Sequence, residues 1–194
     1  MSDVSSVCVF CGSKPGADPA HAEAARTLGR MMAERGIRLV YGGGRIGLMG
    51  IVADAVLAAG GEVIGVIPDF LMKYEVCHQD LTDLIVTDSM HTRKRAMFDR
   101  SDAFVTLPGG LGTLDETFEI ATWKQLRQHD QPIILMDVNG YWQPFIDLAR
   151  RTVDGGYAHE AIMDLWTVVK TPAEVFDAIA AAPDTDDVVL TSHF

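Results

Sequence analysis

The chain has 194 residues, of which 48% are hydrophobic, and this is enough for one sizeable core and favours a single domain. It carries 16 basic and 27 acidic residues, which give a formal net charge of -11 at pH 7. Such a balance creates no general attraction for nucleic acid or for an anionic membrane, so we expect neither as a partner. An anionic ligand would have to be held by a local arrangement of groups.

The three cysteines, Cys8, Cys11 and Cys77, are an odd number, and the first two have the C-x-x-C spacing of some redox and metal sites. They lie in an apolar run, VCVFCGS, and no second pair of cysteines or histidines stands at the spacing of metal ligands. We therefore expect core or loop thiols and no metal site. The N-terminal stretch MSDVSSVCVF does not resemble a signal peptide, so a reducing cytoplasm is the expected location.

Short apolar runs rich in β-branched residues predict strands along the chain, and their poor alternation is typical of strands buried on both faces. These strands are expected at residues 6–10, 37–42, 62–67, 102–107, 132–138 and 166–170. Helices are expected between most of them, at residues 18–36, 47–61, 91–100, 113–127, 141–153 and 171–182. The apolar region at 51–68 is broken by Asp54, Gly60 and Glu62, which favours a helix end, a turn and a strand over a membrane span.

Two of these helices have clear start signals. Asp18 is a candidate N-cap before Pro19 at the first helical position, and Gly36 marks the end of that helix. Thr171 and Glu174 have the spacing of a capping box at the start of the last helix.

Alternation of strands and helices predicts an α/β fold, with a parallel sheet that has helices on both faces. Ligands of such sheets bind beyond the carboxyl ends of the strands. We expect one domain over residues 1–183 and a loose acidic tail over residues 184–194.

Glycine-rich turns follow three of the expected strands, in the segments VFCGSKPG, VYGGGRIGLMG and VTLPGGLGTLDE. Glycine lets backbone N–H groups approach a phosphate, and a helix N-terminus adds partial positive charge. Ser13 and Thr113 can add hydroxyl donors, and Gly43 lies in the second turn. Each turn alone is ordinary α/β architecture, but three at one edge of a sheet favour a phosphate site.

The second turn also matches the dinucleotide pattern G-x-G-x-x-G, through Gly42, Gly44 and Gly47. It follows the second strand instead of the first, and Asp69, at the distance of a ribose-binding acid, does not end a clean strand. Binding of NAD(P) by an oxidoreductase is therefore a minor alternative.

Three carboxylates, Asp115, Glu116 and Glu119, follow the third turn directly. Acidic residues in a first helical turn complement the macrodipole, which can account for any one of them. That explanation is weaker for three carboxylates that share a turn suited to a bound anion.

The segment SMHTRKRAMFDR carries the opposite charge. As a helix it places Met90, Arg93, Lys94 and Met97 on one face, and the methionines indicate that this face points inward. Two cations on an inward face are costly without a counter-charge, unless their stems reach past the methionines to water. A phosphate seat beside a carboxylate suits cleavage of a nucleotide's glycosidic bond, because the ribose gains positive character in the transition state.

The segments MHTRK, residues 90–94, and PGGLGTLDE, residues 108–116, closely resemble the paired signature of the LOG ("Lonely Guy") family. These proteins are cytokinin riboside 5'-monophosphate phosphoribohydrolases, once commonly labelled lysine decarboxylases. The segments VFCGS, YGGGRIGLMG, VIPDFL and TWKQL also resemble family segments, in family order, from about Val7 to the last helix.

The resemblance implies a Rossmann-like, doubly wound, mainly parallel sheet in a homodimer. It also implies an N-glycosidase that hydrolyses a nucleoside 5'-monophosphate to free base and ribose 5-phosphate without an organic cofactor. The substrate would be a cytokinin riboside 5'-monophosphate, AMP, or both. A carrier that binds a nucleotide or cofactor without turnover is the alternative on the same scaffold.

By matching position, Arg93 and Glu116 would be the catalytic pair, with Glu116 facing the ribosyl cation or a water and Arg93 holding it in register. The implied substrate-binding residues are Ser13, Gly43, Glu75, Lys94, Gly109, Gly110, Leu111, Gly112, Thr113 and Thr122. Many family members carry an arginine just before the residue that matches Glu75, where this chain has Tyr74. None of the five lysines, at positions 14, 73, 94, 124 and 170, lies in a recognisable pyridoxal phosphate motif.

Overall fold

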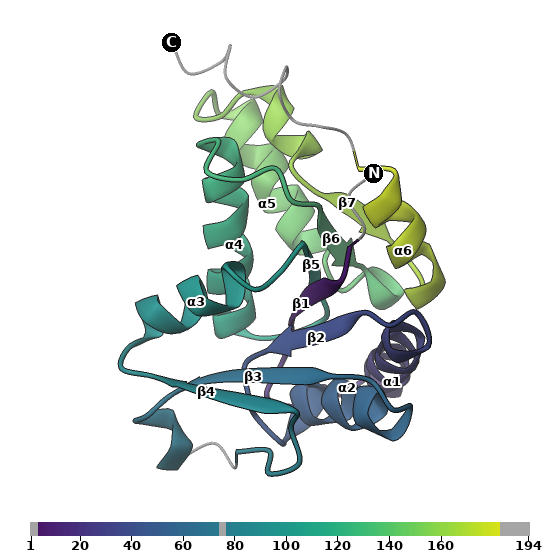
Figure 1. The fold of residues 1–194 in the computed structure, drawn as a ribbon. Coiled ribbons are helices and arrows are strands. Elements are labelled where there is room, and N and C mark those ends of the chain that lie inside the picture. The colour runs from purple at the N-terminus through teal and green to yellow at the C-terminus, as the bar shows by residue number, and fades with distance from the viewer. Residues whose placement is uncertain (1–3, 74–76, 183–194) are drawn as a thin grey trace.

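The computed structural model describes residues 4–73 and 77–182. Its strands form one seven-stranded sheet in the order β4-β3-β2-β1-β5-β6-β7, and every neighbouring pair is parallel (Figure 1). The strands are β1 (Ser6–Phe10), β2 (Arg38–Tyr41), β3 (Val63–Pro68), β4 (Asp83–Thr87), β5 (Ala103–Thr106), β6 (Ile133–Met136) and β7 (Thr167–Val169).

Helices cover both faces of this sheet. They are α1 (Pro19–Glu34), α2 (Gly47–Ala58), α3 (Met90–Phe98), α4 (Leu111–Gln125), α5 (Gln143–Asp154) and α6 (Pro172–Ala180), with short 3-10 turns η1 (Leu71–Lys73), η2 (Val138–Gly140) and η3 (Glu160–Asp164). Among the described residues, no helix is long and apolar enough to cross a membrane.

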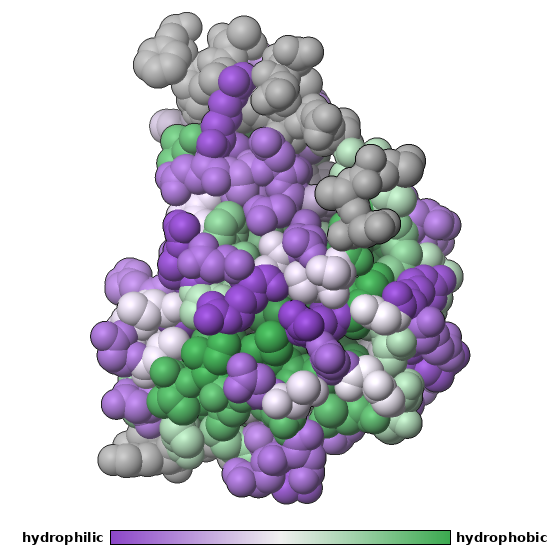
Figure 2. Space-filling model, viewed as in Figure 1, coloured by the Kyte–Doolittle hydropathy of each residue, from purple (hydrophilic) through white to green (hydrophobic). Residues whose placement is uncertain are grey.

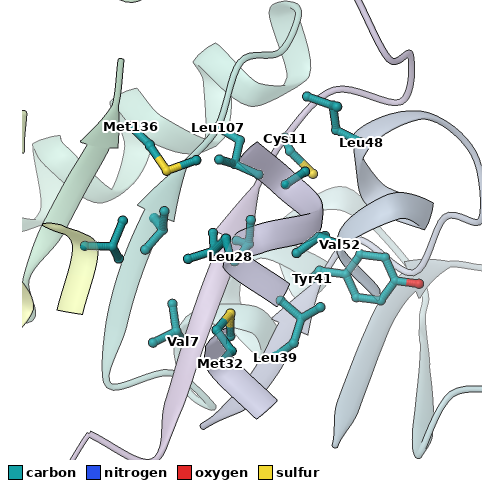
Figure 3. Close-up of a cluster of buried hydrophobic side chains, with 14 of the residues drawn as sticks. Val7, Cys11, Leu28, Met32, Leu39, Tyr41, Leu48, Val52, Leu107 and Met136 are labelled. Atoms are coloured by element: carbon teal, nitrogen blue, oxygen red, sulfur yellow. The ribbon is translucent and has the colours of Figure 1, made fainter. Parts of the chain in front are cut away.

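The core divides at the sheet because alternate residues of β1 point to opposite faces. Val7 and Val9 pack in the cluster that contains buried residues of α1, α2 and α6, among them Leu28 and Met32 (Figure 3). Cys8 packs in the other cluster, on the opposite face, which contains buried residues of α3 and α4. Full burial of a leucine or methionine side chain contributes about 1.5–3 kcal/mol, so both faces stabilise the sheet.

The strand order reverses direction at β1. The chain moves outward from β1 through β2 and β3 to β4, returns through α3 to β5 on the other side of β1, and then moves outward to β7 (Figure 1). The chain therefore leaves β1 and β5 toward opposite faces of the sheet at its carboxyl edge. The two turns begin side by side there, and the Gly12 N–H donates to the Pro108 carbonyl at 3.0 Å. Such a reversal is where open α/β sheets bind ligands.

The expected α/β fold with a parallel sheet and helices on both faces is confirmed. The Asp18 cap is confirmed by its hydrogen bond from the Ala20 N–H, at 2.9 Å, and the capping box of Thr171 and Glu174 is present. The strand β4 was not predicted, and α4 begins at Leu111, two residues before the expected start. The tail at 184–194 lies outside the described residues, so its looseness stays a prediction.

Candidate active site

A cavity of about 320 Å³ lies at the carboxyl edge of the sheet, beside the reversal at β1. It is formed by the end of β1, by the turns after β1, β2 and β5, by η1, and by residues near the starts of α2, α3 and α4. Its lining comprises Val9, Cys11, Gly12, Ser13, Gly42, Met49, Leu71, Met90, Arg93, Gly110, Leu111, Gly112, Thr113 and Glu116.

A buried ion pair faces this cavity. The Arg93 Nη1 lies 2.9 Å from the Glu116 Oε1, and each residue is only 7% exposed. The Arg93 Nε donates a second hydrogen bond, at 3.0 Å, to the Val66 carbonyl in β3. Two bonds to separate elements fix the guanidinium, and the guanidinium in turn fixes the carboxylate.

The position of Arg93 follows from the helix that carries it. Ser89 caps α3 by accepting from the Thr92 N–H, at 3.2 Å, while the Thr92 hydroxyl accepts from the Ser89 N–H. The buried Met97 anchors the same face of the helix in the core, one turn beyond Arg93. The inward face predicted from the helical spacing is therefore present.

Burial raises the pKa of Glu116 above its ordinary value, the adjacent Arg93 charge opposes this, and Asp115 adds to the rise. The carboxylate therefore gains more from a nearby positive centre than an exposed glutamate would. Cys11 also lines the cavity, but burial, and next the Glu116 charge, raise the pKa of its thiol, so it is a neutral group at pH 7.

The first turn of α4 is suited to bind an anion. Its N-cap is Gly110, which has no capping side chain, so the N–H groups of Leu111, Gly112 and Thr113 have no acceptor within the helix. These three residues line the cavity. Backbone N–H groups at a helix N-terminus bind phosphate through hydrogen bonds and the helix dipole.

The second glycine turn differs from the expectation of a phosphate seat. The N–H groups of Leu48 and Met49 in the first turn of α2 donate to the Gly12 carbonyl, at 3.0 and 3.4 Å, so the protein itself occupies them. A side chain at Gly42 would lie 2.2 Å from the Arg93 Nη2, and one at Gly47 would lie 2.3 Å from the Ser13 backbone. Close packing thus accounts for two glycines of the G-x-G-x-x-G pattern, Gly42 and Gly47, without a dinucleotide.

Several residues expected to bind substrate lie at this cavity and others do not. Ser13, Gly110, Leu111, Gly112 and Thr113 line it. Gly43 is buried against Ile67 outside the lining, and Thr122 is exposed on α4, also outside it. Glu75 and Tyr74 lie outside the described residues, so their roles stay predictions.

Lys94 points away from the cavity lining, toward two carboxylates of α4. Its Nζ lies 3.1 Å from the Asp115 Oδ2 and 3.1 Å from the Glu119 Oε1. Burial lowers the pKa of Lys94, but the hydrogen bonds to Asp115 and Glu119 outweigh this and raise it, so the lysine is charged. The counter-charge expected for the two cations is therefore protein carboxylate.

A second cavity, of about 620 Å³, adjoins the first across Gly12, Ser13 and Gly110. Gly109 lies in its lining, and a side chain there would approach the Thr113 Oγ1 to 2.1 Å. Tyr141, also in the lining, donates its hydroxyl hydrogen to the Gly109 carbonyl, at 2.6 Å, and so fixes this loop. Sequence reasoning missed Tyr141, because no local pattern links it to a loop 32 residues upstream.

No group of three or more histidine, cysteine or acidic side chains is placed to hold a metal ion among residues 4–73 and 77–182. The features of the site described above are one buried ion pair, one open helix N-terminus and apolar walls.

Comparison with known proteins gives a consistent result. The sequence model of a family described as "Possible lysine decarboxylase" matches residues 49–179. A probable cytokinin riboside 5'-monophosphate phosphoribohydrolase from Oryza sativa subsp. japonica is 43% identical over 183 residues, which cover 94% of this chain and 69% of the relative. The cytokinin riboside 5'-monophosphate phosphoribohydrolase of Rhodococcoides fascians is 42% identical over 177 residues, which cover 91% of this chain and 88% of the relative.

A solved structure, the molybdenum cofactor binding protein from Rippkaea orientalis, is similar with a TM-score of 0.69 at 21% identity. The match covers 93% of this chain and 98% of that one. At that identity the likeness shows the shared fold alone.

Proposed function

Because this chain belongs to the LOG ("Lonely Guy") family of cytokinin riboside 5'-monophosphate phosphoribohydrolases, we propose that it is an N-glycosidase acting on a nucleoside 5'-monophosphate. The products are a free base and ribose 5-phosphate. The observation that carries the proposal is the buried pair of Arg93 and Glu116 in one cavity with the open N-terminus of α4. The substrate is a cytokinin riboside 5'-monophosphate, AMP, or both.

In this mechanism the 5'-phosphate binds the N–H groups at the start of α4, and Thr113 adds its hydroxyl. The ribose then lies beside Glu116. As the C1'–N bond breaks, positive character develops on the ribose, and the buried carboxylate stabilises it. Water forms the new C1'–O bond, and its proton leaves with the base.

Arg93 holds Glu116 in position through the 2.9 Å contact, and its charge opposes the rise in the pKa of Glu116 that burial causes. A pure phosphate carrier would gain little from a buried carboxylate beside its anion seat, so Glu116 favours catalysis over carriage.

The lysine positions do not favour decarboxylation. A pyridoxal phosphate enzyme needs a lysine amine free to form a Schiff base. Of the described residues that line either cavity, Lys14 is the one lysine, and it lies exposed in the turn after β1. The Lys94 Nζ contacts two carboxylates, and the Lys124 Nζ donates to the Gln131 carbonyl at 3.1 Å.

The proposal is tested by incubating the protein with AMP and, separately, with isopentenyladenosine monophosphate, and measuring free base and ribose 5-phosphate. We expect release by the wild type and a loss of roughly 1000-fold in kcat for Glu116→Gln, with nucleotide binding retained. Glu34→Gln, an exposed change on α1, is the matched control and should leave turnover unchanged. Nucleotide binding without turnover of either substrate by the wild type would instead identify a carrier.

We also propose a homodimer located in the cytoplasm. The face of β3 and β4 on the α3 side carries half-buried Ile64 and Ile85, and Figure 2 shows apolar surface over these two strands. A second copy covering this face would bury it from water. The free thiols of Cys8 and Cys11 in the core are compatible with a reducing compartment.

A further inference from the structure

Two carboxylates of α4 lie close to the phosphate seat without lining the cavity. Asp115 and Glu119 are separated by one helical turn, and their side chains are 58% and 23% exposed. Like charges at this spacing repel one another and destabilise a helix. They also lie on the helix whose N-terminus would receive a phosphate, so they would weaken binding of that anion.

The Lys94 ammonium group offsets both repulsions. Its Nζ lies 3.1 Å from one oxygen of each carboxylate, and its side chain is only 11% exposed. Solvent screens the contact with Glu119 less than the contact with the more exposed Asp115. The cations Arg93 and Lys94 stand against three carboxylates, Asp115, Glu116 and Glu119. Without Lys94 the excess negative charge beside the phosphate would double.

The adjacent cations Arg93 and Lys94 have different partners. Successive residues on a helix point about 100° apart, so Arg93 and Lys94 leave α3 in different directions. Arg93 lines the cavity and contacts Glu116 there, whereas the two partners of Lys94 on α4 do not line it. The Lys94 ammonium therefore contacts protein carboxylates outside the cavity lining.

We propose that Lys94 is a positioning residue, which neutralises Asp115 and Glu119 so that these two carboxylates do not repel an anion bound at the start of α4. This inference rests on the proposed function only for the identity of the substrate. The ion pairs and their effect on Glu116 exist in the protein without nucleotide.

Several charged or titratable groups face Glu116, and the test has to take each of them into account. From α3 these are Arg93 and Lys94, from α4 itself Asp115, and from β1 and the turn after it the neutral thiols Cys8 and Cys11. Asp115 raises the pKa of Glu116 and Lys94 lowers it, so loss of Lys94 should move that pKa upward.

The first measurement is steady-state kinetics with AMP over a range of pH. Lys94→Met should raise KM about tenfold, because phosphate then meets two uncompensated carboxylates, and should move the acid limb of kcat/KM to higher pH. The triple variant Lys94→Met/Asp115→Asn/Glu119→Gln should return KM to within about twofold of wild type and return the acid limb as well. Arg95→Met removes one charge from the exposed side of the same helix and should change neither.

The outcomes separate positioning from direct contact. If Lys94 binds the phosphate itself, neutralising the carboxylates cannot replace it, and the triple variant will bind as weakly as Lys94→Met. That result, or an unchanged KM in Lys94→Met, overturns the proposal. Thermal unfolding of each variant checks that the fold is intact.

A second readout does not depend on turnover. The carboxyl carbon of Glu116 is titrated by ¹³C NMR in the wild type, in Lys94→Met and in the triple variant. A higher titration midpoint in Lys94→Met that the triple variant reverses supports the inference even if no nucleotide is cleaved. An unshifted midpoint contradicts the inference even if the enzyme is active.

Discussion

At the scale of the residue, Gly42 is the neighbour that leaves room for the Arg93 guanidinium. A methyl group there would lie 2.2 Å from the Arg93 Nη2 and 3.1 Å from the Met49 Sδ. Both atoms are at the ends of long side chains, so the fold can adjust while the guanidinium moves away from Glu116. We expect Gly42→Ala to lower kcat/KM at least about tenfold with little change in the thermal unfolding midpoint, measured by kinetics and circular dichroism. An unchanged kcat/KM would show that this placement of Arg93 is not required.

The same scale shows what the sequence could predict of the site. The helical spacing of Met90, Arg93 and Met97 predicted an inward cation, and the glycine turn before Glu116 predicted an anion seat beside it. Helix periodicity and turn chemistry are local, so both could be found. The sequence could not predict whether Lys94 contacts a ligand or protein carboxylates, because its partners depend on how α3 and α4 pack together.

At the scale of the element, the cap of α3 supports both stability and the site. The Ser89 carbonyl accepts from the Arg93 N–H at 3.1 Å, and its hydroxyl accepts from the Thr92 N–H. Ser89→Ala should destabilise the protein by about 1 kcal/mol and lower the unfolding midpoint by roughly 2–4 °C. Ser89→Asn keeps an acceptor at the N-cap and should lose less, as scanning calorimetry of both variants would show. Equal losses in the two variants would mean that the hydroxyl does not cap the helix.

The elements also show where pattern reading fails. The run at residues 83–87, DLIVT, forms β4 at the edge of the sheet, where several of its residues stay partly exposed, so it lacks the long apolar signal of the central strands. The first turn of α2 looked like an anion seat because its sequence does not show that the Gly12 carbonyl, from a distant turn, fills it. In both cases a long-range neighbour decided the outcome.

At the scale of the whole molecule, the partly exposed apolar face of β3 and β4 sets the expected assembly. Ile85→Glu would place a charge on this face, where a second copy would have to desolvate it. We expect the wild type to have the mass of a dimer by size-exclusion chromatography with light scattering, and Ile85→Glu to have the mass of a monomer. Asp83→Asn, at an exposed position of the same strand, is the control and should remain dimeric. A monomeric wild type at micromolar concentration would refute the dimer.

The central place of β1 has a consequence for the order in which the molecule is made. A ribosome releases β1 to β4 and α3 first, so the emerging chain holds the Arg93 guanidinium before its carboxylate partner exists. Only when β5 has paired with β1 does α4 bring Glu116 and the open N–H groups into place. On the proposed mechanism, a nascent polypeptide that ends before Glu116 lacks the carboxylate and should not cleave a nucleotide.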